Sequence, residues 1–251
     1  MKLQIFAITM ASLFIGGIAP SVHGQQNQPQ LMEILEVQVK PEFTAQYEAA
    51  VKERMAWRKD NEYPFQVSAF QLSQGFYRFV TRIGTWSGRD QLNQWFAPFR
   101  SGDAPAFVDP LFASIDNASV SYQMTRPNLS YRPANPRLAA GTANAIHELR
   151  LYFKPGTYRQ VREILAKFVE VYADHGIQEG KLVWRQVAGT DGPVITNYFP
   201  AASTEAFYAN RASGLQEMGS DFQELAEELD PFLRKTEDLD WTIRRDLGLQ
   251  P

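Results

Sequence analysis

Cysteine is absent from the 251 residues of this chain. Its absence excludes disulfide bonds, attachment of a lipid through an N-terminal cysteine, and any metal site built on thiolate ligands. Histidine is scarce as well, with three residues in the chain. No close spacing of histidine with aspartate or glutamate is typical of a zinc or iron site. We therefore expect no bound metal and a fold that is stabilised by its core alone.

An excess of basic residues is also missing, because 25 lysines and arginines stand against 28 aspartates and glutamates. Surfaces that bind nucleic acid usually carry a basic excess, so we expect no nucleic acid as partner. Three catalytic patterns are absent too: a phosphate-binding glycine loop, a nucleophile elbow, and a readable arrangement of serine, histidine and acid. The sequence therefore identifies no reaction, and we predict no cofactor.

Long apolar runs are absent after the first residues of the chain. Residues 3–18 are mostly apolar, but this run is shorter than the ~20 residues that a membrane-spanning helix needs. The run follows a positive charge at Lys2 and precedes small residues that end at Gly24, which is typical of a secretory signal peptide. We expect residues 1–24 to be removed, the mature chain to have no membrane span, and the protein to be periplasmic or secreted.

An internal repeat is the most informative feature that is present. Residues 32–41 and 146–155 both alternate apolar and polar side chains and end in Lys-Pro, at one constant spacing (149 − 35 = 114). Both predict a strand followed by a helix that begins near the proline. The matching positions are Leu35 and Leu149, Val37 and Leu151, Val39 and Phe153, Lys40 and Lys154, and Pro41 and Pro155.

Both halves continue with the same order of predicted elements: strand, helix, strand, strand, helix, strand. In the first half we expect them at residues 32–39, 42–59, 65–72, 76–83, 87–115 (interrupted at 101–105) and 118–125. In the second half we expect them at residues 146–153, 158–174, 181–188, 194–199, 203–235 and 239–245. Asp109-Pro110 also matches Asp230-Pro231, at a wider spacing (230 − 109 = 121). The proline-rich residues 126–145 predict a linker between repeats at residues 25–125 and 146–251.

This element order is that of the ferredoxin-like fold. The helices of one unit cover one face of its antiparallel sheet, so the other face must be buried elsewhere, and two units can bury both bare faces by closing into a barrel. On these residues the chain resembles the dimeric α+β barrel superfamily in a tandem form, and more loosely its NIPSNAP-like and antibiotic-biosynthesis-monooxygenase-like members. The resemblance implies an α+β fold of two ferredoxin-like βαββαβ repeats forming a pseudo-dimeric barrel, as a monomer with a pseudo-twofold axis or as a homodimer.

Strand alternation assigns side chains to the two faces of each sheet. The apolar positions of the repeat are expected under the helices, and the opposite positions inside the barrel. The inward set contains Glu36, Gln38, Arg78, Arg82, Glu148, Arg150, Tyr152, Thr196 and Tyr198. Glu36 and Arg150 are equivalent by the repeat spacing, so we expect them to pair. Two interpretations follow: a site for a small anionic or carbonyl ligand, or an internal salt-bridge network that fixes how the halves mate.

A second candidate site lies between the first sheet and its helices. Arg54 and Arg58 are equivalent to Phe168 and Tyr172 by the repeat spacing, so an apolar stripe of the second half is charged in the first. Together with Trp57, these arginines are expected at the mouth of a ligand pocket. The alternative is that their stems lie over the helix edge with both charges in water.

Two histidines remain after the expected signal peptide. His147 stands near the start of the strand at residues 146–153, on its helix-facing side. There it is the one candidate catalytic residue, as a general base, with a structural role as the alternative. His175 and the following Gly176 are typical of the C-terminal turn of a helix rather than of a haem or metal ligand.

Three functions are consistent with these features. The first is an exported α+β barrel that binds a small organic molecule. The second, implied by the resemblance, is a cofactor-independent monooxygenase or isomerase acting on a small aromatic or polyketide-like substrate between sheet and helices, with His147, Arg54 and tyrosines as its polar groups. The third is a structural or assembly module. An open cavity lined by Arg, Tyr and Glu favours binding or catalysis, whereas a lumen filled by side chains favours the third.

Overall fold

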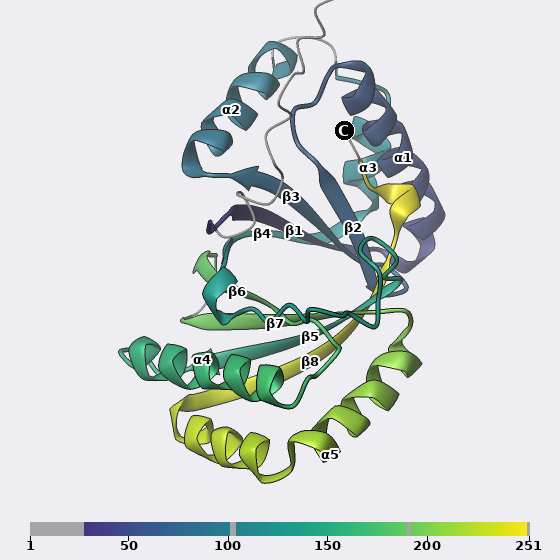
Figure 1. The fold of residues 1–251 in the computed structure, drawn as a ribbon. Coiled ribbons are helices and arrows are strands. Elements are labelled where there is room, and N and C mark those ends of the chain that lie inside the picture. Colours follow the sequence, from purple (N-terminus) through teal and green to yellow (C-terminus); the bar gives the residue numbers. More distant parts are fainter. Residues whose placement is uncertain (1–27, 101–103, 190–191, 250–251) are drawn as a thin grey trace, which may run out of the picture.

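The structure, a computed structural model, describes residues 28–100, 104–189 and 192–249. Eight strands form one closed antiparallel barrel in the order β1-β3-β2-β8-β5-β7-β6-β4, and helices cover its outside (Figure 1). The signal peptide expected at residues 1–24 lies outside the described residues. Within the described ranges, no helix is both long enough and apolar enough to cross a membrane.

Each half contributes four neighbouring strands in ferredoxin-like order. The first half contains β1 (Leu31–Val39), α1 (Thr44–Asp60), β2 (Val67–Ser73), β3 (Phe76–Gly84), α2 (Trp86–Phe96), α3 (Val108–Ser114) and β4 (Ile115–Thr125). The second contains β5 (Ala145–Phe153), α4 (Tyr158–Asp174), β6 (Leu182–Ala188), β7 (Val194–Ala201), α5 (Thr204–Leu229) and β8 (Leu233–Ile243). The predicted fold class is confirmed: two ferredoxin-like repeats close into one α+β barrel.

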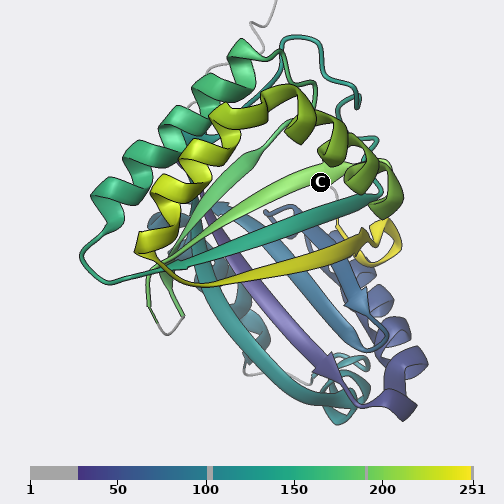
Figure 2. The same cartoon turned by 90° about the horizontal axis from the view of Figure 1, so that it is seen from below.

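Two seams join the sheets of the two halves. At one seam β2 pairs with β8, where Phe70 lies opposite Ile243. At the other, β4 pairs with β6, where Thr125 lies opposite Trp184. Every strand of the barrel therefore has a neighbour on each side, although the pairing of β2 with β8 covers two residue pairs only. The two sheets face each other, and α4 and α5 lie side by side over the second one (Figure 2).

The two faces of each sheet belong to different cores, as the alternation predicts. Val39 of β1 packs with Tyr47 of α1 in the core under the first helices. Phe153 of β5 packs in the same way with Val161 of α4. Ile34, on the opposite face of β1, packs in a separate cluster inside the barrel. The barrel interior is therefore a compartment of its own, lined by the inward-facing positions of both halves.

The boundaries around the last strand of each half differ from the prediction. The helix expected to reach residue 235 ends at Leu229, and β8 begins at Leu233. Pro231 accounts for the difference, because proline lacks the N–H that a continuing helix would use. In the first half the last strand begins at Ile115 rather than at residue 118. Inside α5, Gly219 has a positive φ of 50° and kinks the helix.

The Lys-Pro motif has the same role in both halves. The Nζ of Lys40 donates a hydrogen bond to the carbonyl of Ala113 at 2.9 Å, and the Nζ of Lys154 donates to the carbonyl of Pro231 at 2.6 Å. Each lysine thus binds a carbonyl of the helical turn that precedes the last strand of its half. Pro231 is therefore equivalent to Ala113 (231 − 113 = 118) rather than to Pro110, and the predicted match at a spacing of 121 residues is wrong.

Candidate functional site

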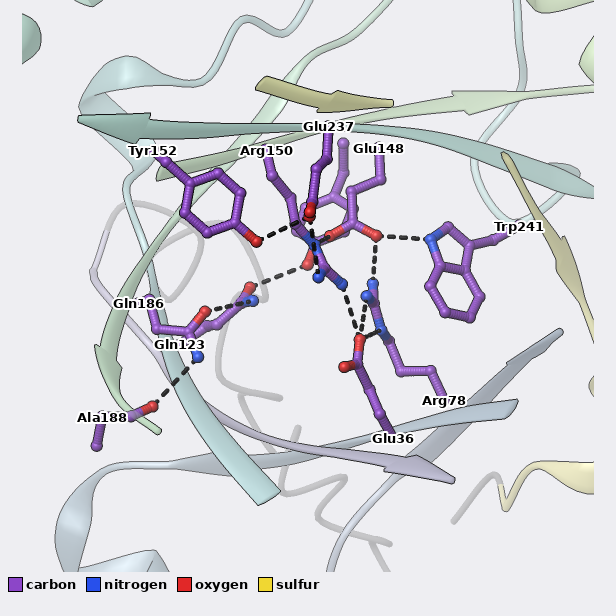
Figure 3. Close-up of polar contacts among 11 residues, drawn as sticks. Glu36, Arg78, Gln123, Glu148, Arg150, Tyr152, Gln186, Ala188, Glu237 and Trp241 are labelled. Carbon is purple, nitrogen blue, oxygen red and sulfur yellow. Dashed lines mark hydrogen bonds and ion pairs between the residues drawn. The ribbon is translucent and has the colours of Figure 1, made fainter. Parts of the chain in front are cut away.

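A network of charged side chains fills one part of the barrel interior (Figure 3). Glu148 of β5 has no exposed surface and accepts hydrogen bonds from Arg78 at 2.7 Å, Arg150 at 2.7 Å and the Trp241 indole at 2.6 Å. Glu36 of β1 accepts from Arg78 Nε at 3.0 Å and from Arg150 Nη2 at 2.8 Å. Each arginine therefore bridges one carboxylate of each half. The predicted pairing of Glu36 with Arg150 is confirmed.

Strand register explains why these groups meet. Glu36 lies opposite Arg78 in the pairing of β1 with β3. Arg150 lies opposite Glu237 in the pairing of β5 with β8, and its Nη1 is 3.7 Å from that carboxylate. Glu237 also accepts a hydrogen bond from the hydroxyl of Tyr152 at 2.8 Å. The network thus runs from β3 through β1 and β5 to β8, across both halves.

Burial and charge act in opposite directions on this network. Burial alone would raise the pKa of the Glu148 carboxyl, but Arg78 and Arg150 outweigh it and hold that pKa below its usual value. Burial alone would lower the pKa of Arg150, but Glu148 and Glu36 outweigh it and raise that pKa. The shifts favour the charged forms of Glu148 and Arg150, and the ion pairs of Arg78 and Arg150 link the two sheets.

The other residues predicted to face the lumen have different surroundings. Tyr198 is buried, and its hydroxyl donates to Gln123 Oε1 at 2.9 Å. Thr196 is buried as well, and its hydroxyl has no partner among the described residues. Arg82 and Gln38 are both exposed, at opposite ends of the lumen. Gln38 therefore lies at the exposed end of the inward face of β1, two residues from Glu36.

The remainder of the lumen contains a cavity of about 150 Å³ beside Arg78. Its apolar walls are formed by Met32, Phe70, Val80, Ile146, Leu182, Trp184 and Trp241. Its polar lining is formed by Arg78, Arg82, Tyr198, Gln66 and Ser68. A second cavity of about 230 Å³ shares Met32, Arg82, Leu182 and Trp184 with the first. Because the two share these walls and Arg82 is exposed, the lumen opens to the surface at Arg82.

Several residues of the lumen were missed by the sequence interpretation. Glu237 was missed because the preceding helix was extended to residue 235 and the strand was begun at residue 239. Trp241 and Trp184 lay within predicted strands, and alternation along those strands could have assigned them to the lumen. Gln123 and Gln186, whose amides lie 3.4 Å apart on β4 and β6, could have been found in the same way.

Arg54 and Arg58 lie between α1 and the first sheet. The Nε atoms of both are buried and have no hydrogen-bond partner in the described part of the chain. Both side chains are nevertheless partly exposed, so the Nε side of each guanidinium is buried while the residue still reaches the surface. Trp57 packs edge-on against Trp95, with ring centroids 5.3 Å apart, and against Phe99 at 4.6 Å. These rings form an aromatic cluster at the end of α1.

His147 is buried between β5 and α5. Its Nδ1 lies 2.9 Å from a carboxylate oxygen of Asp240, and its Nε2 lies 3.1 Å from one of Asp238. The ring of Phe207 stacks on the imidazole with centroids 4.0 Å apart. Both ring nitrogens are therefore engaged by carboxylates, an arrangement that orients the imidazole. His175 caps the C-terminus of α4, as predicted.

A larger cavity of about 610 Å³ lies between the linker and the second half. The linker is held there by a strand-like pairing of Tyr131 with Lys181 and by a hydrogen bond from the Asn144 N–H to the Ala201 carbonyl at 3.0 Å. Phe207, which stacks on His147, forms part of its wall. Sequence interpretation treated residues 126–145 as a linker alone and did not predict this cavity. In the described ranges, no group of His, Asp and Glu is arranged to hold a metal ion.

Strand order and lumen together define the architecture: an α+β barrel made of two ferredoxin-like units joined in one chain, a fold also found in dimeric α+β barrels. An anthrone oxidase-like protein has the same fold, with a TM-score of 0.60 and 10% identity over 88% of this chain and 93% of that chain. A protein from Lactobacillus acidophilus NCFM, provisionally named a monooxygenase, aligns with a TM-score of 0.54 and 9% identity over 88% of this chain and 96% of that one.

A variant chlorite dismutase from Candidatus Nitrospira defluvii, in complex with cyanide, is also similar. Its TM-score is 0.53 at 10% identity, over 90% of this chain and 95% of that chain. At these identities the likeness shows the fold alone. No family model and no curated protein matches the sequence.

Proposed function

We propose that the chain binds a small, mostly apolar organic molecule inside the barrel, in the cavity that opens at Arg82. The observation that carries this proposal is that side chains do not fill the lumen: a cavity of about 150 Å³ remains beside the charged network. A cavity of about this volume holds one benzene ring. The ligand is therefore a molecule with a single aromatic ring or of similar size.

The lining of the cavity supports an orientation for this ligand. Trp184 and Tyr198, whose ring centroids lie 4.6 Å apart, offer aromatic surface to an apolar body. Arg82 stands at the opening and forms no ion pair with another described residue, unlike Arg78. A guanidinium in this position holds a carbonyl or anionic oxygen. We infer that the apolar end enters first and that the polar end stays at Arg82.

Indole, which is one fused ring larger than benzene, tests this proposal as a neutral probe at the upper limit of this size. Titration calorimetry of the purified protein is expected to show saturable binding, and Ser68→Phe, which fills the cavity, is expected to weaken it at least tenfold. The control is Ala140→Phe, which fills the cavity at the linker and leaves indole binding unchanged. Equal binding by Ser68→Phe and the wild type contradicts the proposal. Native mass spectrometry of protein purified from its host then identifies the molecule that accompanies it.

The alternative, a cofactor-independent monooxygenase or isomerase, is supported by the cavity at the linker and by the likeness to an anthrone oxidase-like protein. Its substrate would enter beside Phe207, the residue that separates His147 from that cavity. Oxygen uptake after addition of an anthrone tests it. Uptake by the wild type that His147→Gln abolishes supports this function, and absence of uptake contradicts it for that substrate.

Export to the periplasm or the medium is proposed on the pattern of residues 1–24 and on the absence of cysteine. N-terminal sequencing of the mature protein tests it, since cleavage is expected before Gln25. The looser likeness to NIPSNAP-like proteins and the choice between monomer and homodimer stay predictions.

A further inference from the structure

Two arginines of α1 are partly buried and form no ion pair with another described residue. Arg54 and Arg58 lie one helical turn apart on the face of α1 that carries Tyr47. The Nε atoms of both arginines and the hydroxyl of Tyr47 are buried, and none has a hydrogen-bond partner among the described residues. Three buried donor atoms on one face of α1 are thus without an acceptor among the described residues. Such groups are costly to bury unless something accepts their hydrogen bonds.

Aromatic rings surround the two charges. The guanidinium carbon of Arg54 lies 5.1 Å from the centre of the Phe79 ring, and that of Arg58 lies 4.4 Å from Tyr63 and 5.8 Å from Phe96. Ring faces attract a cation, but they carry no net negative charge. Burial and, after it, the neighbouring charge of Arg58 lower the pKa of Arg54 to about 10. The surroundings therefore leave the positive charge of the pair largely uncompensated.

The carboxylate that acts on Arg58 is already engaged elsewhere. Glu33 attracts Arg58, but its Oε2 accepts a hydrogen bond from the Tyr122 hydroxyl at 3.0 Å and lies 3.2 Å from Arg89 Nε. The lumen shows the contrast, because Arg78 bridges two carboxylates there. Arg78 in the lumen thus has two carboxylate partners, whereas Arg54 and Arg58 have no ion-pair partner among the described residues.

The second half has aromatic residues in place of these arginines. At the equivalent positions α4 carries Phe168 and Tyr172, both buried in apolar clusters. A single cation, Lys181, lies over their rings at 5.6 and 4.9 Å. Helix α4 thus has an apolar face at these positions, whereas α1 has two arginines there. Packing alone does not explain the replacement.

We propose that Arg54 and Arg58, with the hydroxyl of Tyr47, bind the carboxylate of an organic monocarboxylic acid between α1 and the first sheet. Two guanidinium forks match the planar carboxylate, which accepts hydrogen bonds at both oxygens. The surrounding rings favour an anion with one charge and an apolar tail, because a dianion loses more hydration on entry. This site is separate from the lumen cavity, which neither arginine lines.

Thermal unfolding and titration calorimetry with benzoate and butyrate test the proposal, with chloride and sulfate at the same ionic strength for comparison. The wild type is expected to bind both carboxylates saturably, with a rise in Tm that sulfate and chloride do not produce. The double variant Arg54→Phe/Arg58→Tyr copies the residues of the second half and is expected to lose this response. Arg159→Ala, at an exposed arginine, and the lumen variant Ser68→Phe are expected to keep it.

Single lysine variants test the site if the double variant does not fold. Arg54→Lys and Arg58→Lys each keep the charge but remove the fork, and each is expected to weaken benzoate binding at least tenfold. Equal benzoate binding by the wild type and these variants overturns the proposal. So does a wild type that binds sulfate but neither carboxylate, or that binds none of these anions.

Discussion

At the scale of single residues, Glu148 shows how much this fold depends on a paired charge. Its carboxylate has no exposed surface and accepts hydrogen bonds from Arg78, Arg150 and Trp241. Arg78 is itself 2% exposed, so it cannot turn to water when a partner is lost. Removing one member of a buried ion pair is costly because the remaining charge stays buried without compensation.

Glu148→Ala is therefore expected to lower the free energy of unfolding by about 3–5 kcal/mol. Urea denaturation measures this loss. The matched control is Glu163→Ala, at an exposed residue 3.6 Å from Arg159, which is expected to change stability by less than about 0.5 kcal/mol. A loss below about 1 kcal/mol for Glu148→Ala would contradict the argument that this substitution leaves the charge of Arg78 buried and uncompensated.

At the scale of elements, two helical glycines have opposite surroundings. Gly88 is in the first turn of α2, which begins directly after β3, and a Cβ at this position would lie 1.9 Å from the carbonyl oxygen of Ile83. Gly214 is inside α5, where a Cβ would lie 3.6 Å from the Cδ1 of Ile177, an ordinary contact. The first glycine is required by the close approach of helix to strand, and the second is not.

The substitution Gly88→Ala is expected to destabilise the protein by roughly 1–3 kcal/mol, because the helix must move away from the strand end. Gly214→Ala is expected to stabilise it by roughly 0.5–1 kcal/mol, because alanine loses less backbone freedom on folding. Urea midpoints of the two variants and the wild type give the comparison. Similar midpoints for both variants would contradict the assigned role of Gly88.

At the scale of the whole molecule, Arg244 connects the end of the second half to the first. It follows β8 and donates hydrogen bonds to Glu48 of α1 at 2.6 Å, to Gln71 of β2 at 2.7 Å and to Asp246 at 2.9 Å. The hydrogen bond from Arg244 lowers the pKa of Asp246 to about 2, and Arg244 also lowers the pKa of Glu48. The contacts of Arg244 therefore depend on carboxylates that are ionised in the folded state.

These pKa shifts predict a pH dependence. A carboxyl group whose pKa is lower in the folded state stabilises the protein above its ordinary pKa and loses this effect as the pH falls through the folded value. For Asp246 the interval lies between its ordinary value of 3.8 and about 2. The stability difference between the wild type and Arg244→Met is therefore expected to be constant above about pH 5 and to shrink steadily between about pH 4 and pH 2.

Urea midpoints between pH 7 and pH 2 measure this difference. Arg245→Met is the control, because Arg245 donates to Asn144 and to the carbonyl of Gly141 and has no carboxylate partner among the described residues. Its stability difference from the wild type is expected to be independent of pH. If the stability difference between Arg244→Met and the wild type is also independent of pH, the role given to ionised Glu48 and Asp246 is wrong.

Part of the candidate site could be predicted because it depends on local periodicity. Alternation placed Glu36 and Arg150 on the inward face, and the repeat spacing predicted their pairing, which the structure shows at 2.8 Å. Strand side chains alternate strictly, so one correct register assigns a whole face. By contrast, the end of α5 was misplaced because the apolar pattern continues past Leu229, and only Pro231 marked the break.

Other features depend on contacts between distant segments. No spacing in the chain indicates that a cavity of about 150 Å³ remains beside Arg78, because this space is what the side chains of both sheets leave unfilled. The surroundings of His147 also could not be predicted, since Asp238 and Asp240 reach it through the register of β5 with β8. Nor does the sequence show that Arg54 and Arg58 lack a counter-ion.

The sequence by itself determined the order of elements, the twofold repetition and the inward or outward direction of residues in the strands that it located correctly, because these follow from periods of two and about 3.6 residues along a single segment. Only the tertiary structure decided which buried charges are paired and where space remains. Pairing and empty space are set by distances between segments that the closed barrel brings together, and those distances depend on the packing of every neighbouring side chain.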